Sequence, residues 1–180
     1  MYENSDSDGE ELIKEFLEET DIKFKREQKI ADLKGDFKPY RTADFYLPEY
    51  KVYVEFFGLW NIEKSRKDYQ KKREIYEKNK IPCIYIYPDN LGILNFIFKR
   101  RLKKVLKKYD MKWQLFKCNY SIFQEKYLMQ IVILGALIIY LDNILIRGVL
   151  ALLILNIVYH SYREIFKNLG ELQRTAKRLL

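Results

Sequence analysis

Hydrophobic and polar residues alternate along residues 43–57, and this stretch organises the first half of the chain. Ala43, Phe45 and Leu47 share one face of an extended segment, and residues 52–57 form a second run of β-branched and aromatic side chains. These residue types suit a half-buried strand. Residues 48–50 between the two runs predict a turn, because the φ angle of proline is already fixed. The pattern therefore predicts a β-hairpin that ends at Gly58.

The apolar spacing around this hairpin predicts three helices and two further strands. A helix-spaced apolar stripe marks the first helix, and a short apolar run between two prolines is typical of a central, fully buried strand. The expected helices are 5–20, 61–80 and 91–109, and the expected strands are 22–31 and 81–88. This order predicts an α/β domain with a mixed sheet. The hairpin strands are antiparallel, and strand 81–88 follows strand 52–57 in parallel through a crossover helix.

Two carboxylates, Asp44 and Glu55, interrupt the apolar hairpin. A carboxylate in a central strand is costly unless it is paired or bound to a metal. Two carboxylates on neighbouring strands also repel each other, which raises one pKa. A divalent cation between them removes both problems, and oxygen-only ligation indicates Mg²⁺ or Mn²⁺. The alternative is that the two residues lie at opposite strand ends and face water.

Two other polar residues share helix faces with apolar ones. Lys72 lies three residues from both Tyr69 and Ile75, so the helical repeat points it toward the sheet and points Lys71 elsewhere. The alternative for Lys72 is an aliphatic stem on apolar surface with its amine in water. Glu10 lies on or beside the buried face of the first helix, where the helix dipole alone also accounts for a carboxylate.

Charge and rare residues limit the function further. The formal net charge is +8, and the excess concentrates in residues 99–108, where we expect the lysines and arginines of the helix to face outward. Such a basic patch attracts polyanions, either nucleic acid or anionic lipid, although a solvated helix face is the common alternative. The candidate contacts are Lys99, Arg100, Arg101, Lys103 and Lys104. The only histidine, His160, excludes a Ser-His-Asp triad, and Cys83 and Cys118 lack metal or redox spacing, which favours a reducing compartment.

These residues together resemble the PD-(D/E)XK nuclease superfamily, which has the restriction-endonuclease-like fold. The resemblance covers about residues 7–109 and rests on residues 43–48, on residues 52–55 and on the run Ser7-Asp8-Gly9-Glu10. It implies metal-dependent phosphodiester hydrolysis, with Mg²⁺ or Mn²⁺ held by Asp44 and Glu55 and with Glu10 as an auxiliary ligand. The implied substrate is nucleic acid, DNA in preference to RNA.

One position departs from the family pattern. The family places a lysine two residues after the glutamate, and this chain has Phe57 followed by Gly58. Some members with an aromatic residue there look as if the lysine has moved to the following helix. The resemblance then assigns the catalytic lysine to Lys72, the residue that the helix repeat selects independently.

The composition changes after Tyr109. Aromatic residues recur every three or four positions along 113–127, and two nearly pure aliphatic runs follow around a polar break at Asp142 and Asn143. A membrane span needs about 20 apolar residues, and segments 121–141 and 144–162 meet that length as a hairpin. Basic residues flank both outer ends, so the positive-inside rule places them in the cytoplasm. The alternative is a soluble helical hairpin that packs on the first domain or forms a homodimer.

The sequence thus predicts a nuclease-like domain over 1–110, an aromatic linker and hydrophobic helical hairpin over 111–162, and a basic tail over 163–180. The predicted function is a membrane-anchored, metal-dependent nuclease on the cytoplasmic side. The alternatives are a catalytically inactive module that binds nucleic acid at the membrane, and an interaction protein whose lysines bind anionic lipid.

Overall fold

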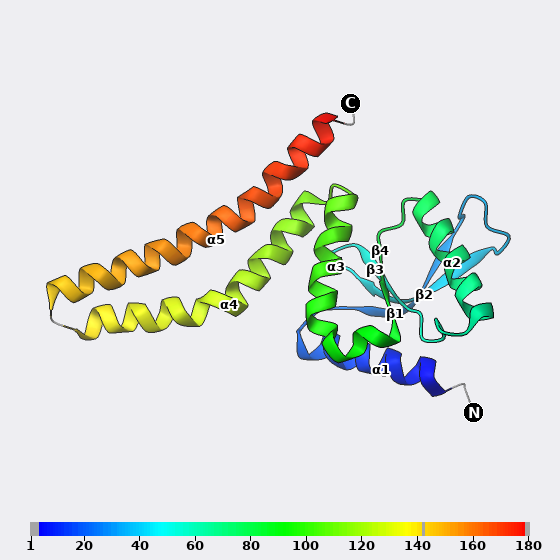
Figure 1. Cartoon of the computed structure of the whole chain (residues 1–180), viewed down its shortest axis with the longest axis horizontal. Coiled ribbons are helices and arrows are strands. Elements are labelled where there is room, and N and C mark those ends of the chain that lie inside the picture. Colours follow the sequence, from blue (N-terminus) through cyan, green and yellow to red (C-terminus); the bar gives the residue numbers. More distant parts are fainter. Residues whose placement is uncertain (1–3, 142, 179–180) are drawn as a thin grey trace. The chain divides into compact units, whose positions relative to one another are not determined.

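The computed structural model describes residues 4–141 and 143–178. The chain divides into two compact units, Met1–Gln114 and Leu115–Leu180. The first unit is α/β and contains a four-stranded mixed sheet (Figure 1). The second unit is helical.

The sheet has the strand order β1-β2-β3-β4. Its strands are β1 (Lys25–Ala31), β2 (Tyr40–Leu47), β3 (Val52–Phe56) and β4 (Cys83–Ile86). Strands β1, β2 and β3 are antiparallel neighbours, and β4 runs parallel to β3. The predicted hairpin and the predicted parallel crossover are therefore confirmed. Strand β1 begins three residues later than expected, although Phe24 just before it still packs against Phe45 with ring centroids 5.7 Å apart.

Helices cover both faces of the sheet (Figure 1). Helix α2 (Glu63–Lys78) packs its buried Ile75 and Tyr76 on one face, in a cluster with Cys83 of β4. Helices α1 (Asn4–Glu19) and α3 (Leu94–Lys108) cover the other face and meet each other through the rings of Phe16 and Phe98, 5.1 Å apart. A short 3-10 helix, η1 (Pro88–Ile93), leads into α3, so the third predicted helix begins later than expected.

Gly9 sets the distance between α1 and the sheet. A Cβ at this position would collide with the ring of Phe56, the last residue of β3. Successive residues of a strand point to opposite faces, so Phe56 contacts α1 while Glu55 points to the α2 side. Gly9 belongs to the Ser7–Glu10 run that carried part of the family resemblance, and close packing is the physical reason for a glycine there.

The prediction of a central position for the last strand is wrong. Strand β4 is an edge strand of the sheet that the structure describes. Its sequence is apolar because α2 and α3 bury its two faces, not because a further strand pairs with it. The guanidinium of Arg101 on α3 donates instead to the carbonyl oxygen of Tyr85, so a side chain occupies part of the open edge.

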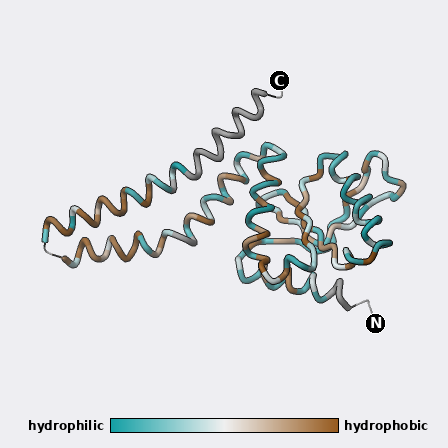
Figure 2. Tube along the Cα trace, in the orientation of Figure 1, coloured by the Kyte–Doolittle hydropathy of each residue, from teal (hydrophilic) through white to brown (hydrophobic). Residues whose placement is uncertain are grey.

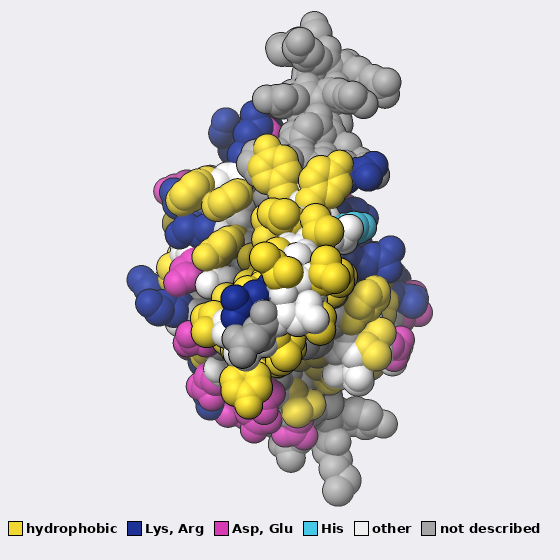
Figure 3. All heavy atoms as spheres, turned by 90° about the vertical axis from the view of Figure 1, so that its left-hand side faces the viewer, with side chains coloured by type: hydrophobic (Ala, Val, Ile, Leu, Met, Phe, Trp, Pro, Cys, Tyr) yellow, Lys and Arg dark blue, Asp and Glu magenta, His cyan; other side chains and the backbone are white. Residues whose placement is uncertain are grey.

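The second unit contains the helical hairpin. Helix α4 (Lys112–Tyr140) starts at the end of the first unit, and α5 (Ile144–Arg178) follows the break around residue 143, where the Asn143 side chain accepts from the backbone N–H of Leu145 at 3.0 Å. The apolar stretches of both helices adjoin this break (Figure 2). Viewed from the break, hydrophobic side chains dominate the hairpin surface (Figure 3). Many stay exposed, including Ile139, Ile144, Leu145, Leu152 and Leu155.

The length criterion for a membrane span gives a mixed result over the described residues. No single helix is both long and apolar enough to cross a bilayer. Two consecutive segments, Lys112–Gln124 and Tyr127–Tyr140, reach the criterion only when taken together, and they are bent by 48°. The apolar part of α5, Ile144–His160, is shorter than the criterion.

Candidate active site

Asp44 and Glu55 meet at the junction of β2 and β3. Phe45 pairs with Val54 in the antiparallel register, so Asp44 lies opposite Glu55 at the next position. The backbone N–H of Phe56 donates to Asp44 Oδ2 at 2.6 Å, which fixes the Asp44 carboxylate against the end of β3. The two predicted metal ligands are therefore neighbours, as the hairpin reading expected, and do not lie at opposite strand ends.

Glu55 is deeply buried, with 1% of its surface exposed. Lys72 Nζ lies 2.5 Å from Glu55 Oε2, and the Tyr76 hydroxyl donates to Oε1 at 2.9 Å. Lys72 Nζ also donates to the carbonyl oxygen of Thr42 on β2 at 2.9 Å. Both carboxylate oxygens of Glu55 thus have a donor from α2, which explains how a carboxylate is tolerated at this depth.

Electrostatics at Glu55 reflect two opposing influences. Burial, and next the negative charge of Asp44, raise the pKa of Glu55 to about 8. Lys72 and Tyr76 act in the opposite direction, because both stabilise the ionised carboxylate. Burial, followed by the charge of Glu55, also raises the pKa of Tyr76, so its hydroxyl remains a donor at neutral pH. A cation that bound beside Asp44 and Glu55, in addition to the Lys72 ammonium, would lower the pKa of Glu55.

The structure places Lys72 at the sheet and Lys71 away from it. Lys71 lies over the ring of Phe37, 5.2 Å from its centroid, while Lys72 reaches Glu55. The direction that the helix repeat predicts for Lys72 is therefore confirmed, and its catalytic role stays a prediction. Surface snorkelling does not describe this residue, since only 18% of its side chain is exposed.

Phe57 lies at the position where the superfamily that the sequence resembles has a lysine, and it packs in the centre of a cluster of aromatic rings. It is fully buried and stacks on Tyr69 of α2 at 4.4 Å between centroids and on Trp60 at 6.0 Å. The rings of Tyr85 and Tyr87 pack against its other sides at 5.2 and 5.8 Å. A lysine would be surrounded by hydrocarbon here, which explains why the cation comes from the helix instead.

Glu10 does not join Asp44 and Glu55 in a group of three. Its carboxylate lies 3.6 Å from the guanidinium of Arg26 on β1. Among the residues that the structure describes, no set of three or more His, Cys, Asp and Glu side chains is close enough to hold a metal together. The role of Glu10 as an auxiliary ligand is a prediction without support from this geometry.

Sequence reasoning missed two features near Glu55. It gave no role to Tyr76, although the spacing of four residues from Lys72 places both on one helix face. It gave no role to Arg41, which binds Asp36 through Nε at 2.5 Å and Nη2 at 2.9 Å and is close enough to Glu55 and Tyr76 to interact with their charges. The Arg41–Asp36 pair spans the connection between β1 and β2, and no sequence motif marks it.

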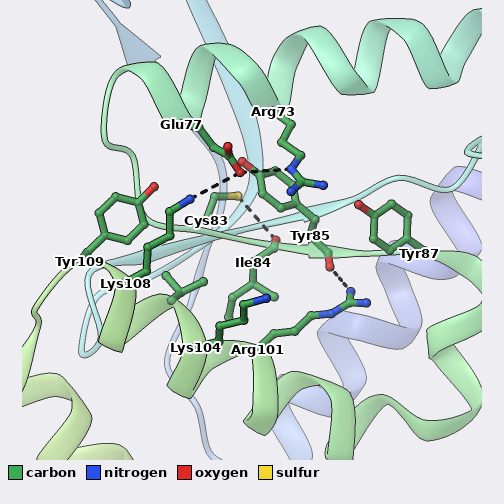
Figure 4. A pocket seen from close by; sticks show the side chains of 11 residues that line it. Arg73, Glu77, Cys83, Ile84, Tyr85, Tyr87, Arg101, Lys104, Lys108 and Tyr109 are labelled. Carbon is green, nitrogen blue, oxygen red and sulfur yellow. Dashed lines mark hydrogen bonds and ion pairs between the residues drawn. The ribbon is translucent and has the colours of Figure 1, made fainter. Parts of the chain in front are cut away.

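The predicted basic surface divides into two parts. Arg101 and Lys104 line a pocket between α2, β4 and α3 (Figure 4). Lys99, Arg100 and Lys103 do not line it. The expectation that every basic residue of this helix faces outward is wrong for Arg101, whose guanidinium lies over the ring of Tyr87 at 5.3 Å and donates to Tyr85. The open edge of β4 gives this arginine an inward partner.

The donor set at Asp44 and Glu55 fits a hard divalent cation. Carboxylate oxygens are the preferred ligands of Mg²⁺ and Mn²⁺. Asp44 and Glu55 are adjacent acids whose mutual repulsion contributes to the raised pKa of Glu55, and a cation shared between them would remove that repulsion. The remaining ligands of such an ion would be water and substrate oxygens.

A scan against known protein families, a search of curated proteins and a search of solved structures return no match for this chain.

Proposed function

We propose that this chain is a membrane-anchored, metal-dependent nuclease of the PD-(D/E)XK type that hydrolyses phosphodiester bonds in DNA or RNA. The observation that carries the proposal is the convergence of Asp44, Glu55 and Lys72 on adjacent strands and the helix that covers them. The strand order and the helices on both faces agree with the restriction-endonuclease-like fold that the sequence resembles.

Each residue has a role that follows from its contacts. Asp44 and Glu55 would hold Mg²⁺ or Mn²⁺, which when bound supplies an activated water and neutralises charge on the phosphate. Tyr76 and Lys72 fix the orientation of the Glu55 carboxylate. An ammonium has three N–H donors, and Lys72 uses two of them on Glu55 and Thr42. The third can stabilise the negative charge that develops on the phosphate.

The direct test is cleavage by the full chain in mild detergent. Assorted DNA and RNA substrates are incubated with Mg²⁺, with Mn²⁺ and with chelator. Asp44→Asn and Glu55→Gln should abolish metal-dependent cleavage, and Glu10→Gln should reduce it less. Glu74→Gln is the matched control, because Glu74 is exposed on α2. Wild-type cleavage by the Glu55→Gln variant would refute the assignment.

A second candidate function is nucleic-acid binding without cleavage. The observation that favours it is that both oxygens of Glu55 already have protein donors, Lys72 and Tyr76. If these contacts persist with substrate, they occupy one lone pair on each oxygen and the Lys72 ammonium repels a second cation, so the site would bind metal weakly and hold nucleic acid only. Oligonucleotide binding that is unaffected by Mg²⁺, together with no cleavage of any substrate, would support this function.

The proposed membrane anchor rests on α4 and α5. Large apolar side chains such as Ile139, Ile144 and Leu145 are more than three-quarters exposed in the second unit. Exposed apolar surface of this extent marks an interaction site. The helices would enter the bilayer as a hairpin, with Arg147 close enough to the break to donate to the carbonyl oxygen of Leu141. The nuclease unit would then lie on the cytoplasmic side, beside the basic flanks.

A further inference from the structure

The pocket at the open edge of β4 gathers positive charge and aromatic surface on the first unit (Figure 4). Arg73 of α2 and Arg101 and Lys104 of α3 reach it from opposite sides, and Tyr85 and Tyr87 form part of its floor. Arg73 lies over the ring of Tyr85 at 5.5 Å, and Arg101 lies over the ring of Tyr87 at 5.3 Å. Each guanidinium thus packs over a ring, which favours its position beside the pocket before any ligand arrives.

The charge of this pocket is not balanced by the protein. Its only carboxylate among the described lining residues is Glu77, which lies 3.2 Å from Arg73 and 3.6 Å from Lys108. No carboxylate of the described chain forms an ion pair with Arg101 or Lys104. Burial lowers the pKa of Arg101, and the neighbouring charges of Arg100 and Arg73 act in the same direction. An anion in the pocket would offset this unfavourable charge.

The chemistry of the lining selects the class of anion. A guanidinium presents several N–H groups in a plane and forms paired hydrogen bonds with phosphate. Arg101 uses Nη1 on the carbonyl oxygen of Tyr85, which leaves other N–H groups for a ligand. Tyrosine rings beside cations provide the stacking surface that sugars and bases use. Phosphate attached to a nucleoside fits this combination better than a carboxylate does.

The pocket is also close to the candidate active site. Tyr85 is the register partner of Glu55 across β3 and β4, and neighbouring strands are about 4.8 Å apart. The strand that lines the pocket is therefore the immediate neighbour of the strand that carries Glu55.

We propose that the pocket formed by Arg73, Arg101, Lys104 and the tyrosines of β4 binds a nucleotide phosphate of the substrate strand. This inference rests on the proposed nuclease function for the choice of nucleic acid as the source of the phosphate. It replaces the expectation of a uniformly basic helix face with one defined subsite.

Two matched pairs on α3 test the pocket against diffuse electrostatic attraction. Lys104→Gln is compared with Lys103→Gln, and Arg101→Gln is compared with Arg100→Gln. Each pair removes the same charge from adjacent residues of one helix, and only one member of each pair lines the pocket. Binding of a short fluorescein-labelled single-stranded oligonucleotide to the full chain is measured by anisotropy in mild detergent and chelator, which prevents cleavage.

Lys104→Gln and Arg101→Gln should weaken binding about tenfold, the loss of one charge-assisted hydrogen bond. Lys103→Gln and Arg100→Gln should change it less than about twofold, as expected for charges that do not line the pocket. Equal losses within both pairs would overturn the pocket. Arg101 also contacts β4. If Arg101→Gln changes the tryptophan fluorescence of the folded protein, the test rests on the comparison of Lys104→Gln with Lys103→Gln alone.

Competition experiments distinguish a nucleotide phosphate from free inorganic phosphate as the ligand of the pocket. Adenosine monophosphate should displace the oligonucleotide from the wild type more strongly than inorganic phosphate does, and adenosine should not displace it. Equal competition by adenosine and its monophosphate would overturn the assignment. If the matched pairs behave alike while Glu55→Gln still abolishes cleavage, the pocket fails and the nuclease function stands. If the pairs differ but no substrate is cleaved, the pocket stands and the nuclease function fails.

Discussion

Replacement of Lys72 by methionine tests the central ion pair without requiring any activity. The substitution keeps an unbranched side chain of similar length and removes the ammonium that lies 2.5 Å from Glu55 Oε2 and 2.9 Å from the Thr42 carbonyl. Glu55 is then left with Tyr76 as its donor on α2. Because burial already raises the pKa of Glu55 to about 8, loss of the neighbouring cation should raise that pKa further.

The magnitude follows from proton linkage. A raised carboxyl pKa stabilises the fold fully below its unfolded value, near 4.5, and this contribution is lost as pH rises toward the folded pKa. In the wild type the decrease in the free energy of unfolding with rising pH ends near pH 8. In Lys72→Met, where the pKa of Glu55 is higher, the decrease continues above pH 8 at about 1.4 kcal/mol per pH unit. The lost hydrogen bonds add about 1 kcal/mol at all pH values. The deficit of the variant should therefore be about 1 kcal/mol at pH 6 and roughly 2 to 3 kcal/mol at pH 9.

Tryptophan fluorescence provides the assay in the full chain. Both tryptophans, Trp60 and Trp113, belong to the first unit, so urea unfolding followed by their emission reports on that unit. Lys71→Met is the control and should lose less than about 0.5 kcal/mol at either pH, because Lys71 lies over the exposed ring of Phe37 and away from Glu55. A deficit for Lys72→Met that does not grow with pH would refute the reasoning. Restoration of stability at pH 9 in the double variant with Glu55→Gln would support it.

Three further predictions concern other parts of the chain. Phe57→Lys restores the family pattern in sequence but places an ammonium among four aromatic rings, so it should lower the free energy of unfolding by at least about 3 kcal/mol and should not raise cleavage; a stable and more active variant would contradict this. Arg41 lowers the pKa of Asp36 to about 2, so the stability from this pair is present above pH 4 and is lost as pH falls toward 2. Asp36→Asn should therefore be less stable than the wild type at pH 7 and should approach it near pH 2 in acid-unfolding curves. Cell fractionation should leave the full chain in membranes after salt and alkaline washes, and recovery as a soluble dimer would favour the alternative for α4 and α5.

The hairpin and the direction of Lys72 could be predicted from sequence because each depends on one strong local periodicity. Alternation along 43–57 fixes which strand residues face the core, and the observed burial of Ala43, Phe45 and Leu47 follows it. The spacing of Lys72 from Tyr69 and Ile75 fixes its direction on α2 in the same way. Local periods of this kind do not depend on the rest of the fold.

The position of β4 and the direction of Arg101 could not be predicted, because both depend on whether a further strand pairs with β4. An apolar run reads the same in the centre of a sheet and at an edge that helices bury on both faces. The neighbour of β4 on its open side among the described residues is a guanidinium from α3, and its hydrogen bond to the Tyr85 carbonyl spans sixteen residues of sequence. Residues 99–108 therefore read as a uniform basic face although Arg101, Lys104 and Lys108 line the pocket beside β4.

The presence of Phe57 on the strand and of Lys72 on the helix has a physical explanation that links these observations. A lysine two residues after Glu55 would lie on the same strand face as Glu55, and here that position is filled by a ring packed against Trp60 and Tyr69. Tyr69 is three residues before Lys72, so the residue that stacks on Phe57 shares a helix face with the lysine that reaches Glu55. The aromatic cluster thus holds α2 in the register that delivers the ammonium. The aromatic ring on the strand and the lysine on the helix thus belong to one packing arrangement, and a variant that disrupts the stacking of Tyr69 on Phe57 should weaken the Lys72–Glu55 contact.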